Sequence, residues 1–265
     1  MRPAAAARQY VCLCSLTGAL LVGPLSAAAD DLPQGWSGKG QAGYVMSRGN
    51  SDTDAANAKL DLYLVRQDWK HNLQLDGLFG RSAGVTSAER WDARLQSDYQ
   101  ITQRVFSFGA LSYQNDRFSG FEYQASGSAG LGYKLLDSQD TRFAVQAGVG
   151  YRSLRAEFLV KDPVTGAVTE RIAVPPTQSE LVGTTGIDFM HRFNASTRVL
   201  DKFISESGSS NTSIRNDLSL EVKMSKKLSL AAGYSIQHNT SPPAGLKKTD
   251  TTSTLNLVYA FPDPK

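Results

Sequence analysis

The chain has 265 residues, a formal net charge of +3 and a mean hydropathy of −0.29. Both cysteines, Cys12 and Cys14, lie near the N-terminus, so we expect the remaining chain to contain no disulfide and no cysteine metal site. After the N-terminal leader, no segment approaches the roughly 18 consecutive apolar residues that a membrane-spanning helix needs.

The N-terminal segment has the features of a secretory signal peptide. Two arginines precede a short apolar run, which ends in an A-x-A site completed by Ala29. We predict a cleaved signal peptide at residues 1–29 and one mature domain at residues 30–265. Cleavage would remove two arginines and leave 26 basic against 25 acidic side chains. A nearly neutral mature chain gives no reason to expect a nucleic-acid partner.

Strand-like segments follow the leader, and in each of the first four apolar and polar side chains alternate at period two, as in a β-strand. These four cover residues 36–47, 56–64, 69–79 and 90–101. The fourth is the clearest, because its aromatic and aliphatic residues alternate with arginines and aspartates. A fifth segment, residues 105–115, reads as a strand, but its pattern does not settle which face is apolar.

The sixth segment, residues 122–134, predicts a transmembrane strand. One face has Tyr123 and Tyr133 at its ends and only small or aliphatic residues between them. Ten residue steps cover roughly 33 Å along a strand, or roughly 23 Å along the membrane normal at a tilt near 45°. This height is close to the apolar band of roughly 25 Å, edged by aromatic girdles, on outer-membrane barrels.

A seventh segment, residues 142–152, precedes the longest predicted connection, residues 156–178, in which prolines and a glycine act as strand breakers. The last five segments are residues 180–189, 196–205, 213–224, 228–237 and 254–261. The second of these five is poorly patterned. The last alternates aliphatic and aromatic residues up to a near-terminal Phe261, like the assembly signal of outer-membrane proteins.

About twelve strands, joined alternately by tight turns and longer polar loops, predict an all-β fold: a transmembrane antiparallel up-and-down β-barrel in the outer membrane of a Gram-negative cell. A secreted soluble barrel or sandwich is the alternative, since alternation does not say which face is outside. The patterned strands have ten to thirteen residues, where five or six is usual, and this length favours the membrane barrel. Aromatic residues at both ends of several apolar faces favour it too.

In this orientation, aromatic residues form girdles at the two membrane interfaces and charged residues line the lumen. The predicted girdle consists of Trp69, Trp91, Tyr99, Tyr123, Tyr133, Phe143, Tyr151, Phe189, Tyr259 and Phe261. The predicted lumen lining consists of Lys59, Asp61, Asp76, Arg90, Asp92, Arg94, Asp98, Arg142, Arg152, Glu180, Asp188, Arg215, Asp217, Glu221 and Lys223. A water-filled path and a lumen plugged by acid–base pairs both remain open, and the mixed signs argue against strong ion selectivity.

Two stretches resemble the DUF481 family, whose members are described as salt-induced outer-membrane proteins. They are residues 49–53, Gly-Asn-Ser-Asp-Thr, and residues 115–126, which begin Asn-Asp-Arg-Phe-Ser-Gly-Phe. The likeness extends over residues 35–261. It implies an outer-membrane barrel and an association with salt or osmotic stress, and it supplies no substrate or catalytic residue.

Three histidines, His71, His191 and His238, fall on the predicted lipid-facing parity. A lipid hydrolase would place a serine–histidine pair on that surface, but the hydroxyls beside His238 lack an orienting acid at strand spacing. We interpret the three as interface histidines and expect neither enzymatic activity nor a zinc site.

Two polar loops have residues that bind ligands in other proteins. Residues 50–54 are rich in oxygen ligands, yet a calcium loop needs several more, and turn chemistry explains them. A binding role for Arg117 in the loop after residue 115 stays open.

The sequence therefore predicts a passive channel, or a barrel that supports the envelope under salt stress, without a cofactor. The alternative is a non-conducting structural barrel, or one that binds a partner through the connection at residues 156–178, and a lipid hydrolase is a remote third. Expected partners are outer-membrane lipids and lipopolysaccharide, and the barrel-assembly machinery during biogenesis. The oligomeric state stays open.

Overall fold

The computed structural model describes residues 34–48, 53–82, 85–117, 119–162, 168–243 and 245–261. The described chain is built from strands: β1 (Gly35–Arg48), β2 (Thr53–Arg66), β3 (Trp69–Ser82), β4 (Val85–Gln100), β5 (Val105–Asp116), β6 (Phe121–Asp137), β7 (Thr141–Lys161), β8 (Val168–Ala173), β9 (Gln178–Arg192), β10 (Thr197–Ser207), β11 (Thr212–Lys223), β12 (Leu228–Asn239) and β13 (Thr249–Phe261). No helix in this part of the chain is long and apolar enough to cross a membrane.

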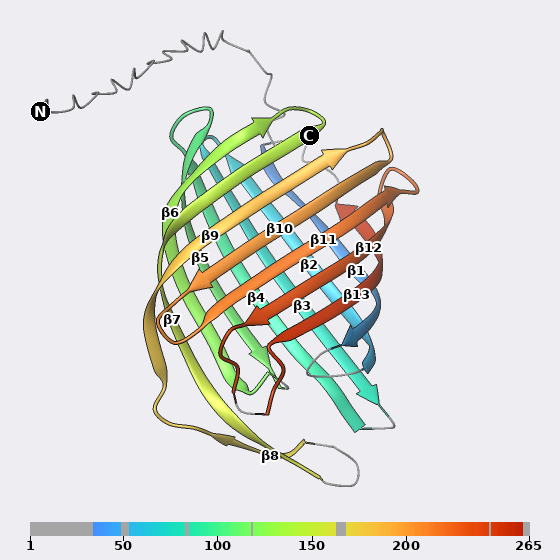
Figure 1. Cartoon of the computed structure of the whole chain (residues 1–265). Helices are drawn as coiled ribbons and strands as arrows, with labels where there is room; N and C mark the ends of the chain where they lie inside the picture. The colour runs from blue at the N-terminus through green and yellow to red at the C-terminus, as the bar shows by residue number, and fades with distance from the viewer. Residues whose placement is uncertain are drawn as a thin grey trace, which may run out of the picture.

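Twelve of these strands close into one antiparallel barrel (Figure 1). Strand β1 pairs with both β2 and β13, and β7 pairs with both β6 and β9, so the ring has no open edge. The predicted barrel of about twelve antiparallel strands is confirmed. Strand β8 lies outside the ring, because it pairs only with the extension of β7.

The barrel has two distinct rims. The first, which we call the terminal rim, is where β1 begins and β13 ends, and its turns are residues 67–68, 101–104, 138–140, 193–196 and 224–227. The opposite end, the hairpin rim, is where the β7–β8 hairpin extends beyond the barrel (Figure 1).

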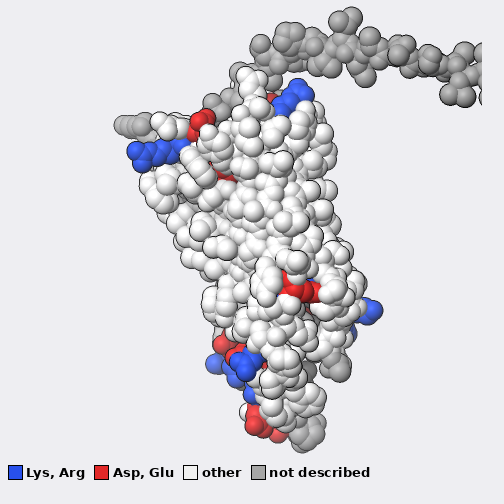
Figure 2. All heavy atoms as spheres, turned by 90° about the vertical axis from the view of Figure 1, so that its left-hand side faces the viewer, with Lys and Arg blue, Asp and Glu red and all other residues white. Residues whose placement is uncertain are grey.

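The apolar face of most barrel strands points outward. Leu131, Val149 and Leu181 are 58%, 72% and 78% exposed, whereas Arg152, on the opposite face of β7, is 2% exposed. Charged side chains gather toward the two ends of the face shown in Figure 2 and leave a broad uncharged band between them. An exterior of this kind suits hydrocarbon, because lipid offers no partner to charged groups.

The aromatic residues predicted to form girdles lie on the outward faces in clusters near the two rims. Near the terminal rim, the rings of Trp69 and Tyr99 are 5.0 Å apart and those of Tyr259 and Phe261 are 5.8 Å apart. Near the hairpin rim, Trp91 stacks on Tyr113, a residue outside the predicted set, and Tyr113 stacks on Tyr123. The members that are exposed are Trp69, Trp91, Tyr99, Tyr133, Tyr151, Tyr259 and Phe261, and the half-buried ones are Tyr123, Phe143 and Phe189.

The structure differs from the sequence prediction after residue 156. The predicted connection at 156–178 contains the end of β7 and the whole of β8, which form a hairpin. A bidentate ion pair between Arg171 and Glu157 holds the two strands of this hairpin together. The prediction failed because neither β7 nor β8 contains a proline, and Pro175 and Pro176 lie beyond β8.

The structure assigns faces to the two segments whose pattern was unclear. In β5, Phe106 and Phe108 are buried inside the barrel and Leu111 is 62% exposed outside. In β10, Leu200, Lys202, Ile204 and Glu206 alternate along the lumen side, and Asp201, which also borders the second cavity, accepts a hydrogen bond from Asn216 on the other face at 2.7 Å. The predicted leader at residues 1–29 and the oxygen-rich loop at residues 49–52 lie outside the described residues.

Candidate functional site in the barrel lumen

Three cavities follow one another along the lumen. The largest, about 420 Å³, reaches the terminal rim and is lined there by the turn residues Gln67 and Asp68. A cavity of about 220 Å³ adjoins it, and the two share Lys202 among their lining residues. The third, about 100 Å³, lies toward the hairpin rim and shares Asp76 and Arg215 with the second.

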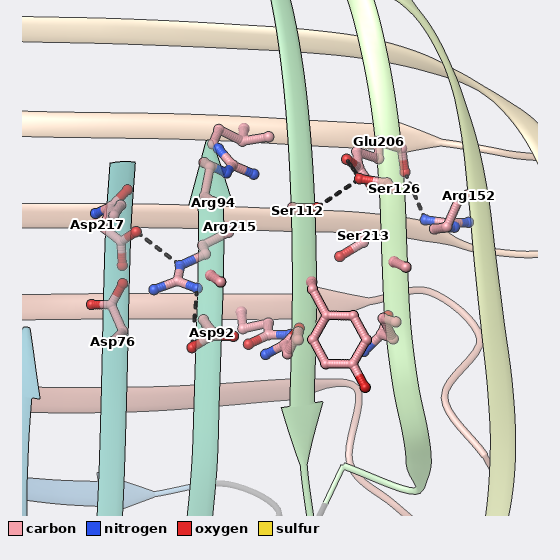
Figure 3. Close-up of a pocket in the computed structure, with 18 of the residues that line it drawn as sticks. Asp76, Asp92, Arg94, Ser112, Ser126, Arg152, Glu206, Ser213, Arg215 and Asp217 are labelled. Atoms are coloured by element: carbon pink, nitrogen blue, oxygen red, sulfur yellow. Dashed lines mark hydrogen bonds and ion pairs between the residues drawn. The ribbon is translucent and has the colours of Figure 1, made fainter. Parts of the chain in front are cut away.

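The lumen is bridged near its middle by Arg215. The Arg215 Nε donates a hydrogen bond of 2.9 Å to Asp217 Oδ2 on the same strand, and its Nη1 lies 3.9 Å from Asp92 Oδ2 (Figure 3). Strands β11 and β4 lie on opposite sides of the ring of twelve. The contact between Arg215 and Asp92 therefore crosses the full bore and divides the second cavity from the third.

Other lumen charges form pairs along the walls. Lys59 and Asp76 are 3.5 Å apart, and Arg90 and Asp92 are 3.2 Å apart. Buried Glu221 accepts bonds from the Arg198 guanidinium and lies 3.9 Å from Lys39 Nζ. Pairing of this kind offsets the cost of burying these charges in the lumen.

The hairpin rim is held closed by contacts across the bore. Gln237 on β12 donates to Gln114 on β5 at 3.5 Å, and these strands are again opposite in the ring. Above this pair, Gly120 has a φ of 74°, and a Cβ at Gly120 would lie 2.5 Å from Leu246 and 3.0 Å from Pro243. The β12–β13 connection therefore packs on the β5–β6 turn across the mouth of the barrel.

Arg152 anchors the same rim. Its guanidinium donates to Glu180 and to the main-chain carbonyl of Asn211, and Glu180 also accepts bonds from Ser209 and Ser210. These contacts fix the β10–β11 connection to the rim of β7 and β9.

The predicted lumen residues border the three cavities with two exceptions. Lys59, Asp61, Asp76, Arg90, Asp92, Arg94, Asp98, Arg142, Arg152, Asp188, Arg215, Asp217 and Glu221 border at least one cavity. Glu180 lies at the hairpin rim, where it binds Arg152. Lys223 is exposed at the end of β11.

The lumen residues of β10 were not among those predicted from the sequence. Lys202 borders all three cavities, and Glu206 borders the third, where it accepts a bond from Ser126 at 2.8 Å (Figure 3). The signal was weak, because inward Leu200 and outward Asp201 invert the expected polarity of this strand. The spacing of Arg198, Lys202 and Glu206 is the pattern that would have found it.

Each histidine lies directly across from a hydroxyl on the neighbouring strand. The Nδ1 atoms of His71, His191 and His238 are each 2.8 Å from Ser97, Thr141 and Thr249, respectively. Within the described residues, no carboxylate bonds to these rings, so none has the third member of a catalytic triad. Arg117, the predicted loop residue, forms an exposed ion pair with Glu89 at 2.8 Å.

The family of proteins described as "Protein of unknown function, DUF481" matches residues 40–261. The chain belongs to this family. It is 23% identical to the uncharacterized protein YdiY of Escherichia coli K12 over 254 residues, which cover 89% of this chain and 92% of YdiY.

Two solved structures share the fold. The NanC porin aligns with a TM-score of 0.50 at 10% identity, over 84% of this chain and 98% of the porin. The translocator domain of the autotransporter NalP from Neisseria meningitidis also has a TM-score of 0.50, at 13% identity over 88% of this chain and 91% of that domain. At such low identity the likeness shows the barrel fold alone.

Proposed function

We propose that this DUF481 protein is an outer-membrane barrel that works as a narrow passive channel for ions and small polar solutes. The observation that carries the proposal is the chain of three charged cavities that share lining residues from the terminal rim to the hairpin rim. Cavities of about 100 to 420 Å³ with polar walls have room and partners for water. The contact of Arg215 with Asp92 crosses the bore, so small solutes are the class that fits.

Weak selectivity between ions follows from the paired charges. Arg215, Arg90 and Lys59 all have a carboxylate within 4.0 Å, so the walls present alternating signs rather than one field. A ring of one sign is what gives a pore strong charge preference.

Planar-bilayer recording of the protein purified from outer membranes tests the channel. We expect small stepwise conductances with similar permeability for potassium and chloride. A protein that inserts into the bilayer and never produces steps would contradict the proposal.

A non-conducting structural barrel is the second candidate, and the closed hairpin rim favours it. Gly120 packs against Pro243 and Leu246 across the mouth, and the Gln114–Gln237 bond lies just beneath. The two candidates differ in whether this bridge opens. We also propose that the protein is linked to salt or osmotic stress and that it has no enzymatic activity.

A further inference from the structure

We propose that the cavity at the terminal rim binds small zwitterionic solutes, whose anionic group contacts Lys202 and whose cationic group contacts Asp188. The inference rests on the proposed function only for the solute's passage through the lumen. Binding itself needs access from the terminal rim, which the cavity reaches.

Lys202 is a cation that faces two acids without forming a close ion pair with either. It lies in register with Asp188 on β9 and with Asp217 on β11, so its side chain points into the lumen between two acids. Asp217 is engaged by Arg215 and Ser235. Among the described residues, the Lys202 ammonium forms no hydrogen bond and no ion pair within 4.0 Å.

Asp188 is the matching anion. It borders the same cavity, and its side chain is exposed even though it lies inside the barrel. The described residues offer it no hydrogen bond and no ion pair within 4.0 Å either. Residues opposite each other on antiparallel strands have Cβ atoms about 5 Å apart, so a solute with both charges can reach both groups.

The other charges of this cavity are balanced. Its lining has four basic residues, Lys70, Lys134, Arg142 and Lys202, and four acidic residues, Asp68, Asp98, Asp137 and Asp188. Asp98 lies 3.9 Å from Lys70, and Asp137 lies 3.4 Å from Lys134 and 4.0 Å from Arg142. Asp68 belongs to the turn at the rim. The inner wall is therefore left with one charge of each sign, Lys202 and Asp188, that has no ion pair within 4.0 Å among the described residues.

A balanced cavity discriminates against simple ions. An anion at Lys202 would lie beside the negative charge of Asp188, and a cation at Asp188 would lie beside the positive charge of Lys202. A zwitterion neutralises both groups at once and forms a charge-assisted contact with each. The aromatic rings of Tyr63 and Phe106, which also line the cavity, suit the alkyl groups of such a solute.

Isothermal titration calorimetry of the detergent-purified protein tests the site with glycine betaine, acetate and tetramethylammonium as probes. We expect betaine to bind at least about tenfold more tightly than either single ion, the effect of losing one charge-assisted contact. Lys202→Met and Asp188→Asn should each weaken betaine binding by a similar factor, whereas Lys202→Arg should preserve it. Lys226→Met and Asp140→Asn, in exposed turns of the terminal rim, are the matched controls.

Three results would overturn the site. These are no heat with betaine, acetate binding as tightly as betaine, and betaine affinity unchanged in Asp188→Asn. The ligand comparison in the unmodified protein decides the matter even when a variant does not fold. If betaine binds in calorimetry but the protein never conducts, the binding site is supported and the channel proposal is contradicted. The two proposals can therefore fail separately.

Discussion

Arg152 shows how a single buried ion pair organises the hairpin rim. The side chain is 2% exposed, and its guanidinium contacts Glu180 and the carbonyl of Asn211. Glu180 in turn binds the backbone and side chain of Ser210. The loss of one member of a buried pair leaves the other charge uncompensated, which is more costly than the pair is stabilising.

We therefore expect Arg152→Met to lower the free energy of unfolding by about 3 kcal/mol. Arg117→Met is the matched control, because the ion pair of Arg117 with Glu89 is exposed on both sides and such pairs contribute about 0–1 kcal/mol. Urea unfolding of both variants in detergent gives the comparison. Equal losses of unfolding free energy in the two variants would show that burial does not make the ion pair of Arg152 more stabilising than the exposed pair of Arg117.

Individual residues also show where sequence reasoning succeeds. The inward orientation of Asp92, Arg94 and Arg215 could be predicted, because each lies on the polar face of an alternating strand. Closure of the barrel turns this face toward the lumen. The contact of Arg215 with Asp92 could not, because it joins opposite walls and depends on the strand number and stagger of the ring. Pairing across the bore is a property of the closed ring.

At the scale of the elements, a contact between two connections covers the mouth of the barrel at the hairpin rim. The β5–β6 turn and the β12–β13 connection meet across the mouth, where Gly120 leaves room for Leu246. Glu157, in the β7 extension, donates its backbone N–H to the Gly120 carbonyl at 2.8 Å, so a third element joins the same point. Glycine is favoured here twice, by its positive φ and by the close approach of Leu246.

A Gly120→Val substitution should displace the β12–β13 connection and raise the single-channel conductance. The added side chain would occupy the space of Leu246, and a β-branched residue resists a φ of 74°. Gly109→Val on β5 is the control, since a Cβ there meets nothing within 4 Å. Unchanged conductance in a correctly folded Gly120→Val barrel would mean that the bridge is not the barrier.

Two elements escaped the sequence pattern for physical reasons. β10 was unclear because Asp201 lies on its outward face, paired with Asn216, while aliphatic Leu200 and Ile204 point inward. β8 was missed because it is a short strand of six residues with no barrel face of its own. An alternating pattern indicates that one face of a strand lines the lumen and the other faces outward. The β7–β8 hairpin extends beyond the barrel wall, so its residues need not show this pattern.

At the scale of the whole molecule, one orientation explains both surfaces. Aliphatic residues such as Val149 and Leu181 point outward, whereas charged residues such as Arg215 and Asp217 border enclosed cavities. A soluble barrel would reverse this arrangement, because its apolar face would form the core. The long alternating strands made this orientation predictable, and the closed ring of twelve gives it its geometry.

Spin labels at single cysteines test the orientation most directly, since the only native cysteines are Cys12 and Cys14. Matched neighbours are available on three strands: outward Leu111, Leu131 and Val149, and inward Ser112, Ser128 and Gln146. In lipid bilayers, we predict that oxygen relaxes the outward labels most strongly and that a polar nickel reagent relaxes the inward ones. Outward labels that respond to the nickel reagent as strongly as the inward ones would contradict the account.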